Sequence, residues 1–308
     1  WFFYTGSAEC ACRNKIYMVM KTGLVLGKFL PLHKGHIALV DFALRHCDHL
    51  IILLCSSPFE IIPGAVRKQW LLETFDANNR IRVELTEYNE EELPNTSVSS
   101  HEVSEKWAAY LGKAFPEMNV FFSSEPYGDY VASFLKIPHI CFDQPRIGNP
   151  ISASAILRNP FNLWEYISPA ARPWFVKKIC ISGSESTGKT TLTEKLSRYF
   201  DTAFVPEMAR EVIGKTEEVV FDDLIKIATL HAKTINEKIQ QANKLLICDT
   251  DVYITKSYSK YLFNQPLQTP DWIIQANRFA LHIFLETDCP YVQDDTRLPP
   301  EERNKLSE

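Results

Sequence analysis

The sequence predicts an α/β protein made of two tandem domains, each built on a parallel β-sheet. Short β-type runs alternate with helix-type patterns along most of the chain, and this alternation is typical of βαβ units. A proline-containing segment interrupts the alternation once, near the middle of the chain. The length of 308 residues agrees with this division, because domains usually hold roughly 100–200 residues.

The composition is typical of a soluble globular protein. Hydrophobic residues make up 45% of the chain, charged residues make up 23%, and the formal net charge is −5. This mild acidity argues against non-specific binding to nucleic acid or to anionic membranes, which needs a basic excess. A phosphate pocket needs only a few local cations, so nucleotide substrates remain compatible with it. No apolar run approaches the ~18 residues that span a bilayer.

The cysteines indicate a reducing compartment. The eight cysteines form no C-x-x-C pair, so their spacing does not suggest a zinc site. Cys55, Cys180 and Cys248 lie in apolar strand-like runs, where a thiol behaves as a small hydrophobic group. We therefore expect reduced thiols in a cytoplasmic protein.

The first domain is predicted to cover residues 21–160, after an unstructured leader at 1–20. The leader has no methionine before Met18 and lacks the charged-then-apolar order of a signal peptide. Hydrophobic periodicity then predicts five strands with helices between them. We expect strands at 22–27, 49–55, 81–87, 119–124 and 138–143, and helices at 35–46, 65–77 and 99–114.

A linker is predicted at residues 161–176, followed by a second domain at 177–308. Pro160, Pro169 and Pro173 bias the residues before them away from the helical region, so this segment should hold only short helices. The second domain repeats the alternation, with strands expected at 177–183, 202–207, 244–251 and 280–286. It is expected to be truncated at its C-terminus.

The segment GSESTGKT at 183–190 matches the phosphate-binding pattern G-x-x-x-x-G-K-[ST], between a strand and a helical pattern. Its glycines let backbone N–H groups converge on phosphate at a helix N-terminus. Lys189 is expected to reach the β/γ-phosphates, and Thr190 to offer its hydroxyl to Mg²⁺. The residues expected to bind ATP are Gly183, Ser184, Glu185, Ser186, Thr187, Gly188, Thr190 and Thr191.

Further polar residues follow the neighbouring strands of this second domain. Asp249 ends an apolar run, as expected of the metal-side carboxylate of P-loop proteins. Glu207, Arg210 and Asp251 are candidate substrate ligands, and both carboxylates remain open as the kinase base. Arg297, in a polar loop, is a candidate for stabilising the transferring phosphoryl group. No N-K-x-D segment is present, so a small-molecule kinase is favoured over a GTPase.

Two histidines flank a glycine after the first strand, in the segment GKFLPLHKGH at 27–36. A helix N-terminus attracts anions, and the imidazoles of His33 and His36 can donate to phosphate oxygens. Gly35 permits close backbone approach, and Lys28 adds positive charge. We expect this site to stabilise an α-phosphate while pyrophosphate leaves. A zinc site is disfavoured because no Cys, Asp or Glu nearby completes a ligand set.

This segment resembles the H-x-G-H signature of the nucleotidyltransferase superfamily, and PISASAILRNP at 150–160 resembles its I-S-x-x-x-I-R segment. With FFSSEPYGDY at 121–130, the P-loop and CDTD at 248–251, the ordered set resembles NadR-type proteins. These fuse a Rossmann-like NMN adenylyltransferase to a P-loop ribosylnicotinamide kinase. The resemblance implies phosphorylation of nicotinamide riboside to NMN, then adenylyl transfer from ATP to NMN, giving NAD. It also implies ATP binding by Gly27, Phe29, Gly35, His33, His36, Ser152 and Arg158.

Three departures from the family pattern qualify this expectation. Leu157 stands where the family has arginine, and Arg158 comes one residue later. One residue turns a helical side chain by about 100°, so we expect adenylyl transfer to be weaker than kinase activity. The helix-turn-helix found before this pair in some relatives is missing, so no repressor function is expected. The third departure is the short C-terminus.

Two other functions remain open from the sequence. One is a nucleotidyltransferase–kinase fusion that acts on another nucleoside, and the other is a non-catalytic ATP or NAD sensor. Trp107 and Tyr127 are candidates for stacking on nicotinamide. The expected partners are small molecules, with no nucleic acid or membrane. The oligomeric state stays open, a homo-oligomer included.

Overall fold

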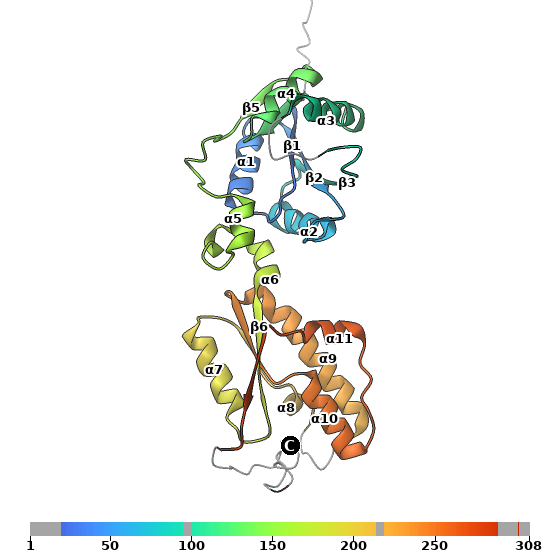
Figure 1. Cartoon of the computed structure of the whole chain (residues 1–308), viewed down its shortest axis with the longest axis vertical. Coiled ribbons are helices and arrows are strands. Elements are labelled where there is room, and N and C mark those ends of the chain that lie inside the picture. Colours follow the sequence, from blue (N-terminus) through green and yellow to red (C-terminus); the bar gives the residue numbers. More distant parts are fainter. Residues whose placement is uncertain (1–19, 95–99, 214–218, 289–300, 302–308) are drawn as a thin grey trace, which may run out of the picture. The chain divides into compact units, whose positions relative to one another are not determined.

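The computed structural model describes residues 20–94, 100–213, 219–288 and 301, and they form two compact units (Figure 1). Unit 1 takes residues 20–30 and 34–150 of the described chain. Unit 2 takes residues 31–33 and everything described from Ile151 onward.

Unit 1 is built on a five-stranded parallel sheet with the strand order β3-β2-β1-β4-β5. The order reverses between β1 and β4, and such switch points gather ligands at the carboxyl ends of the strands. The central strands β1 and β2 are almost wholly apolar, as expected of parallel strands covered on both faces. The strands are β1 (Thr22–Gly27), β2 (His49–Ser56), β3 (Ile81–Glu87), β4 (Val120–Ser123) and β5 (His139–Cys141).

Helices cover both faces of this sheet. Successive strand residues point to opposite faces, so Phe121 packs with α3 and α4 whereas Phe122 contacts Phe42 of α1. Ser100 caps the start of α3 by accepting a hydrogen bond from the Val103 N–H, at 3.4 Å. The helices of unit 1 are α1 (Lys34–Leu44), α2 (Gly64–Phe75), α3 (His101–Ala114) and α4 (Tyr127–Leu135).

Unit 2 is built on a four-stranded parallel sheet with the strand order β7-β8-β6-β9. The two central strands pair over Lys177–Ile181 and Leu245–Asp249, so the end of β8 lies beside the start of the P-loop. The strands are β6 (Lys177–Gly183), β7 (Phe204–Val205), β8 (Leu245–Asp249) and β9 (Leu281–Leu285).

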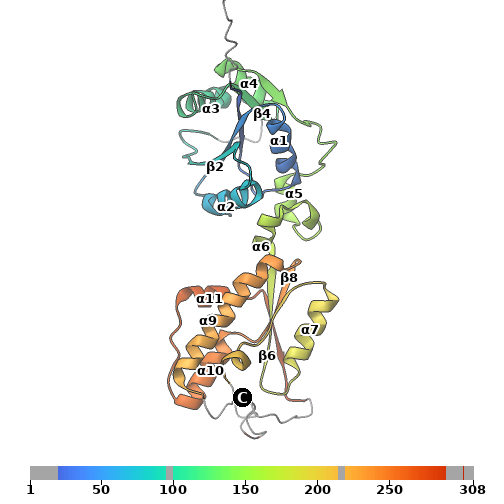
Figure 2. The same cartoon turned by 180° about the vertical axis from the view of Figure 1, so that it is seen from behind.

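Helix α7 covers one face of the unit 2 sheet, and α9, α10 and α11 cover the other (Figures 1 and 2). Small residues of α9, Ala228 and Ala232, let it pack closely against α10 and α11. The α-helices of unit 2 are α5 (Ala153–Arg158), α6 (Arg172–Phe175), α7 (Lys189–Tyr199), α8 (Ala209–Val212), α9 (Phe221–Lys238), α10 (Val252–Phe263) and α11 (Asp271–Ala276).

The proline-containing segment forms short helices, as predicted: η1 (Trp164–Tyr166), η2 (Pro169–Ala171) and α6. It is not an extended linker, because Trp164, Ile167 and Ala171 are buried. The segment belongs to unit 2 together with α5. The division between the units therefore falls at Pro150/Ile151, ten residues before the end of the predicted first domain. A third short helix, η4 (Ile239–Gln241), follows α9.

The predicted strands and helices are confirmed within two residues at each end, and the mixed α/β class with parallel sheets is confirmed. The five cysteines of the described residues are free thiols, and all except Cys141 are buried. Burial raises the pKa of Cys55 to about 12 and that of Cys248 to about 12. No described helix is both long and apolar enough to span a membrane.

Arg67 of α2 organises the carboxyl edge of the unit 1 sheet. Its guanidinium is fully buried and pairs with Glu60. It also donates to the Lys28 carbonyl after β1, to the Ser56 hydroxyl at the end of β2 (2.8 Å) and to the Ile62 carbonyl (3.0 Å). One side chain thereby fixes the loops that follow two neighbouring strands.

We expect Arg67→Ala to lower the free energy of unfolding of unit 1 by about 3–5 kcal/mol, because it removes the buried partner of Glu60 and leaves buried carbonyls without their donor. Hydrogen exchange of the β1 and β2 amides measures this loss. Arg82→Ala is the matched control. Arg82 pairs with Glu84 and Glu117 at the surface, so its removal should cost less than about 1 kcal/mol. Equal costs for the two variants would contradict this role of Arg67.

Candidate functional site

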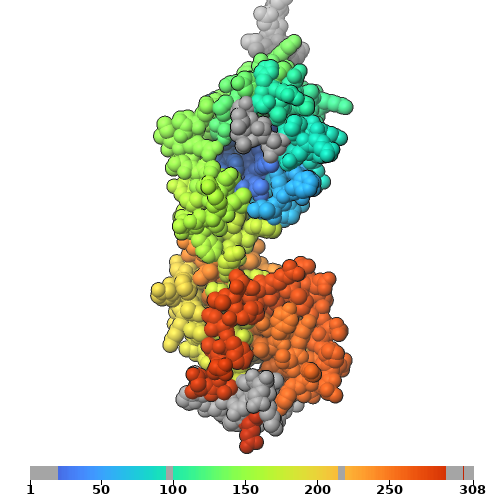
Figure 3. Space-filling view, in the orientation of Figure 1, coloured from blue at the N-terminus to red at the C-terminus, as the bar shows by residue number. Residues whose placement is uncertain are grey.

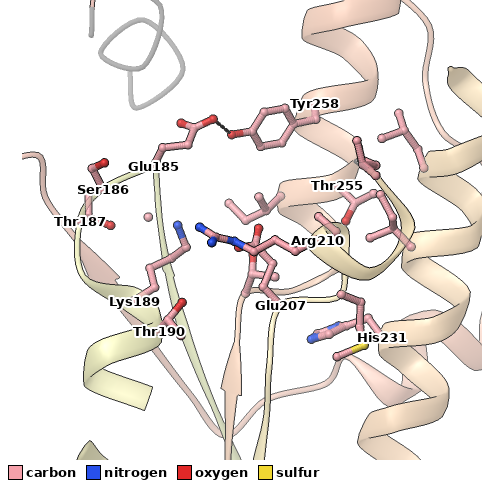
Figure 4. Close-up of a pocket in the computed structure, with 18 of the residues that line it drawn as sticks. Glu185, Ser186, Thr187, Lys189, Thr190, Glu207, Arg210, His231, Thr255 and Tyr258 are labelled. Carbon is pink, nitrogen blue, oxygen red and sulfur yellow. Dashed lines mark hydrogen bonds between the residues drawn. The ribbon is translucent and has the colours of Figure 1, made fainter. Parts of the chain in front are cut away.

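A cavity of about 210 Å³ lies at the carboxyl end of the unit 2 sheet. One wall is the P-loop and the start of α7, and the opposite wall is formed by α9 and α10 (Figure 4). The segment after β7 contributes Glu207 and Arg210. The structure thus brings together most of the residues that the sequence predicts for the kinase site.

Two positions of the P-loop require glycine. Gly183 has φ +147°, and a Cβ there would lie 2.6 Å from the Leu285 carbonyl oxygen. Gly188 has φ +86° and open space around it, so a side chain would fit there. Its backbone conformation is nevertheless unfavourable for residues other than glycine. Ser186 also has a positive φ, of 58°. These dihedrals curl the loop so that its N–H groups turn toward the start of α7.

Lys189 reaches over the P-loop. Its ammonium donates to the Ser184 carbonyl at 2.8 Å, and the Thr187 hydroxyl donates to the same carbonyl at 2.9 Å. In Figure 4 the ends of the Lys189 and Arg210 side chains point toward the same part of the cavity, from opposite walls. Two cations converging beside a helix N-terminus form a strongly anion-attracting site.

Asp249 lies at the base of this cationic region, at the end of β8. The Thr190 hydroxyl donates to its Oδ2 at 2.6 Å, which joins the start of α7 to β8. Its other oxygen, Oδ1, is buried and has no hydrogen-bond partner among the described residues. Burial raises the pKa of Asp249 to about 6, against the lowering effect of the Thr190 hydrogen bond. A buried carboxylate oxygen beside a hydroxyl has the donor chemistry that Mg²⁺ prefers.

Glu185 and Tyr258 form a second polar pair at the cavity, where the Tyr258 hydroxyl donates to Glu185 (Figure 4). Burial raises the pKa of Tyr258, and the neighbouring carboxylate raises it further. The pair joins the P-loop to α10 across the cavity.

His231 and Thr250 are two further buried polar residues in the cavity lining. The Nε2 of the imidazole has no hydrogen-bond partner among the described residues. Burial lowers the pKa of His231 to about 4, so the ring is neutral at neutral pH. Thr250 has φ +69°, which is strained for a β-branched residue, and its buried Oγ1 also has no partner in the described chain.

Asp251 is turned away from this cavity and is not part of its described lining. Its Oδ1 caps α10 by accepting from the Tyr253 and Ile254 N–H groups, at 2.8 and 3.0 Å. Its Oδ2 faces the Cys180 thiol at 3.8 Å and His282 Nδ1 at 3.6 Å. These three residues could hold a metal ion by their donor types, but both carboxylate oxygens of Asp251 already have partners within the protein.

Sequence reasoning missed several lining residues. Thr255 and Tyr258 face the cavity one helical turn apart on α10. Leu224, Ile227 and His231 share one face of α9. A histidine on an otherwise apolar helical face was the available signal for His231. Arg297, predicted to act on the phosphoryl group, lies outside the described residues.

The residues predicted for adenylyl transfer are divided between the two units. Gly27, Lys28, Phe29, Gly35 and His36 belong to unit 1. Lys28 forms an ion pair with Glu60 at 2.8 Å. Burial acts to lower the Lys28 pKa, but the hydrogen bond and charge of Glu60 outweigh it and raise the pKa. Phe29 is buried with φ 49° and packs edge-on against His36, with ring centroids 4.9 Å apart.

The dark-blue region that contains β1 and α1 is visible at the bottom of a hollow in unit 1, beside the light-blue α2 region (Figure 3).

His33, Ser152 and Arg158 belong to unit 2. His33 is buried, and its backbone forms an isolated antiparallel β-bridge with Ile167. Ser152 caps α5 by accepting from the Ala155 N–H at 3.2 Å. Arg158 is exposed, and its Nε donates back to the Ser154 carbonyl of the same helix at 3.2 Å.

The two aromatic candidates for nicotinamide stacking lie in the core region of unit 1. Trp107 is 9% exposed, packs edge-on against Tyr88 and donates to the Pro94 carbonyl at 3.2 Å. The Tyr127 hydroxyl donates to the Leu26 carbonyl at 3.3 Å, and burial raises its pKa. Trp107 belongs to the core cluster of unit 1, and the partly buried Tyr127 packs against that cluster.

Comparison with known proteins gives the chain its family. The model of a family described as "AAA domain" matches residues 178–308. The chain is 32% identical over 298 residues to the trifunctional NAD biosynthesis/regulator protein NadR of Escherichia coli (strain K12). It is 31% identical over 293 residues to the protein of the same name from Salmonella typhimurium (strain LT2). Both alignments cover 89% of this chain and 71% of the relative.

Solved structures agree on the fold. A crystal structure of NadR protein in complex with NR matches with a TM-score of 0.75 and 24% identity, covering 93% of this chain and 83% of that one. A NadR structure in complex with NAD and AMP-PNP matches with a TM-score of 0.75 and 22% identity, covering 93% and 85%. By its similarity to the two curated relatives, this chain belongs to the NadR family.

Proposed function

We propose that the chain is an NAD salvage enzyme whose unit 2 phosphorylates nicotinamide riboside to NMN with ATP. The observation that carries this proposal is the unit 2 cavity. It combines a P-loop with an apolar wall large enough for a small acceptor, and its lining residue Thr190 is hydrogen-bonded to a buried strand-end carboxylate, Asp249, that has one oxygen without a partner in the described chain. The names of the relatives and the NR complex of a NadR protein support the choice of acceptor.

The P-loop and its two neighbouring cations would hold the ATP phosphates. Loop N–H groups and the Lys189 ammonium face the β/γ-phosphates, and Arg210 approaches from the opposite wall. Thr190 and Asp249 would hold Mg²⁺, since a hydroxyl and an unpaired carboxylate oxygen suit this ion. When bound, Mg²⁺ supplies charge stabilisation at the phosphate oxygens.

Glu207 is the better placed of the two carboxylates left open as the kinase base. It lines the cavity, whereas Asp251 caps α10 and faces away. In the proposed step, the riboside hydroxyl oxygen bonds to the γ-phosphorus as the bond from the γ-phosphorus to the ADP oxygen breaks. Glu207 accepts the hydroxyl proton, and Lys189 and Arg210 stabilise the charge on the phosphoryl oxygens.

We propose that the N-terminal part of the chain then transfers AMP from ATP to NMN, giving NAD and pyrophosphate. The segment from Gly27 to His36 lies at the carboxyl end of the central strand β1, and Ser152 caps α5 within the second motif. In this proposal the small-molecule partners are ATP, nicotinamide riboside and NMN. The proposed localisation is cytoplasmic.

The kinase proposal predicts that the purified chain converts nicotinamide riboside and ATP to NMN and ADP. Mass spectrometry of the products would show a gain of one phosphate. Lys189→Ala should lower kcat/KM about 100-fold or more, because it removes a cation that stabilises the transferring phosphoryl group. Lys195→Ala, on the same helix α7 but outside the cavity lining, is the matched control and should keep full activity. Absence of NMN from the wild-type reaction would contradict the proposal.

Adenylyl transfer should be slower than phosphorylation in the same protein. Arg158 folds back on α5, and Leu157 occupies the motif position of the arginine. We expect Leu157→Arg to raise the rate of NAD formation from NMN and ATP by about tenfold, since a guanidinium there can neutralise phosphate charge. Leu157→Gln, which adds length without charge, should not. A wild-type adenylyl transfer rate equal to its kinase rate would refute this account of Leu157.

A further inference from the structure

The proposed phosphoryl transfer gives no role to the side chains of Glu185 and Tyr258, although both line the unit 2 cavity. The Tyr258 hydroxyl donates a hydrogen bond to Glu185 Oε1 (Figure 4). The second carboxylate oxygen, Oε2, is buried and has no hydrogen-bond partner among the described residues. A buried polar atom without a partner is costly, so native proteins rarely keep one without a role. Because a carboxylate oxygen accepts hydrogen bonds, the partner that Oε2 requires is a donor.

The charges around the cavity limit which ligand group can supply this donor. Lys189 and Arg210 line the cavity and would hold the ATP phosphates, whereas the Glu185 carboxylate would repel them. The backbone N–H groups of the P-loop still face phosphate, but the Glu185 side chain requires an uncharged group with a proton to donate. The hydrogen bond to Tyr258 also holds this side chain toward α10, which belongs to the wall opposite the P-loop.

The covalent structure of a riboside places its sugar near the P-loop. The hydroxyl that would receive the phosphoryl group is on the 5′-carbon, directly beside the sugar ring, whereas the aromatic base is attached at C1′. Leu224 and Ile227 of α9 supply apolar surface for the base, since apolar side chains suit a flat aromatic ring better than a hydroxyl-bearing sugar. The sugar hydroxyls are then the uncharged donors nearest to the P-loop carboxylate.

We propose that Glu185 Oε2 accepts a hydrogen bond from a secondary hydroxyl, 2′ or 3′, of the acceptor ribose, and that this bond selects ribosides over their deoxy analogues. Tyr258 is a positioning residue that holds the carboxylate through Oε1. This inference rests on the proposed riboside kinase function and adds its specificity for the sugar. An acceptor that lacks the matching hydroxyl leaves a buried carboxylate oxygen without a donor, and sites of this kind reject such analogues strongly.

Three acceptors test this assignment with ATP as the donor: nicotinamide riboside, its 2′-deoxy analogue and its 3′-deoxy analogue. The analogues each lack a single hydroxyl and keep both the base and the reacting 5′-hydroxyl. We expect the wild-type protein to prefer nicotinamide riboside over at least one analogue by about 10- to 100-fold in kcat/KM.

Four variants separate sugar recognition from a general role. Glu185→Ala should lower this preference to about twofold or less, whereas Glu185→Gln retains an acceptor oxygen and should keep part of it. Tyr258→Phe keeps the ring but removes the hydroxyl, so it should also reduce the preference. Glu194→Ala is the matched control, because Glu194 pairs with Arg198 on α7 and is not part of the described cavity lining. It should keep the full preference.

The ratio between acceptors decides the outcome, because a loss of ATP binding, of the base or of folding lowers kcat/KM for all three acceptors equally. Equal losses in the Glu185→Ala protein would therefore refute the assignment. If the wild-type protein phosphorylates the three acceptors equally well, the kinase proposal stands and the role of Glu185 is refuted. If it phosphorylates none of them, the kinase proposal itself fails, and this inference fails with it.

Discussion

The hydrogen bond from Thr190 to Asp249 is the interaction on which the unit 2 site depends. At 2.6 Å it joins the first turn of α7 to the end of β8, so the phosphate-binding loop and the strand-end carboxylate keep a fixed relation. The parallel pairing of β6 with β8 makes this possible, because both strands end at the same edge of the sheet. The cost is a fully buried carboxylate whose second oxygen lacks a partner in the described residues.

The same edge also explains why chemically different groups meet in one small cavity. Lys189 and Arg210 supply positive charge, Glu207 supplies a carboxylate, and the α9 face supplies apolar surface. Asp249 is joined to this lining by its hydrogen bond with Thr190. These groups come from the start of α7, the segment after β7, the end of β8 and one face of α9. Phosphoryl transfer needs mainly positioning and charge stabilisation, and a rigid parallel sheet with short connections provides both.

Much of this site could be predicted from the sequence, because the P-loop is a continuous motif and Asp249 directly follows an apolar strand. The sequence could not separate Glu207 from Asp251 as the base, since both follow strands. Only the structure shows that Asp251 is used to cap α10. His231 was missed because it depends on helix packing. In the N-terminal half the strands were predicted well, but the division at Ile151, which assigns Ser152 and Arg158 to unit 2, depends on tertiary packing of apolar residues such as Trp164 and Ile167.

The central claim is that Asp249 is held at a cost to stability in order to bind a cation with ATP, and Asp249→Asn tests it most directly. Burial raises the folded-state pKa of Asp249 to about 6, above the unfolded value of about 3.9, so its ionisation lowers the free energy of unfolding progressively between about pH 4 and pH 6, and the full loss persists above pH 6. Hydrogen exchange of the β6 and β8 amides at pH 7.5 should therefore show the ligand-free Asn variant to be more stable than the wild type, by about 1–3 kcal/mol. Addition of Mg²⁺ and ATP should reverse this order by stabilising the wild type more. An Asn variant that is less stable without ligand, or equally stabilised by Mg²⁺ and ATP, would contradict the claim.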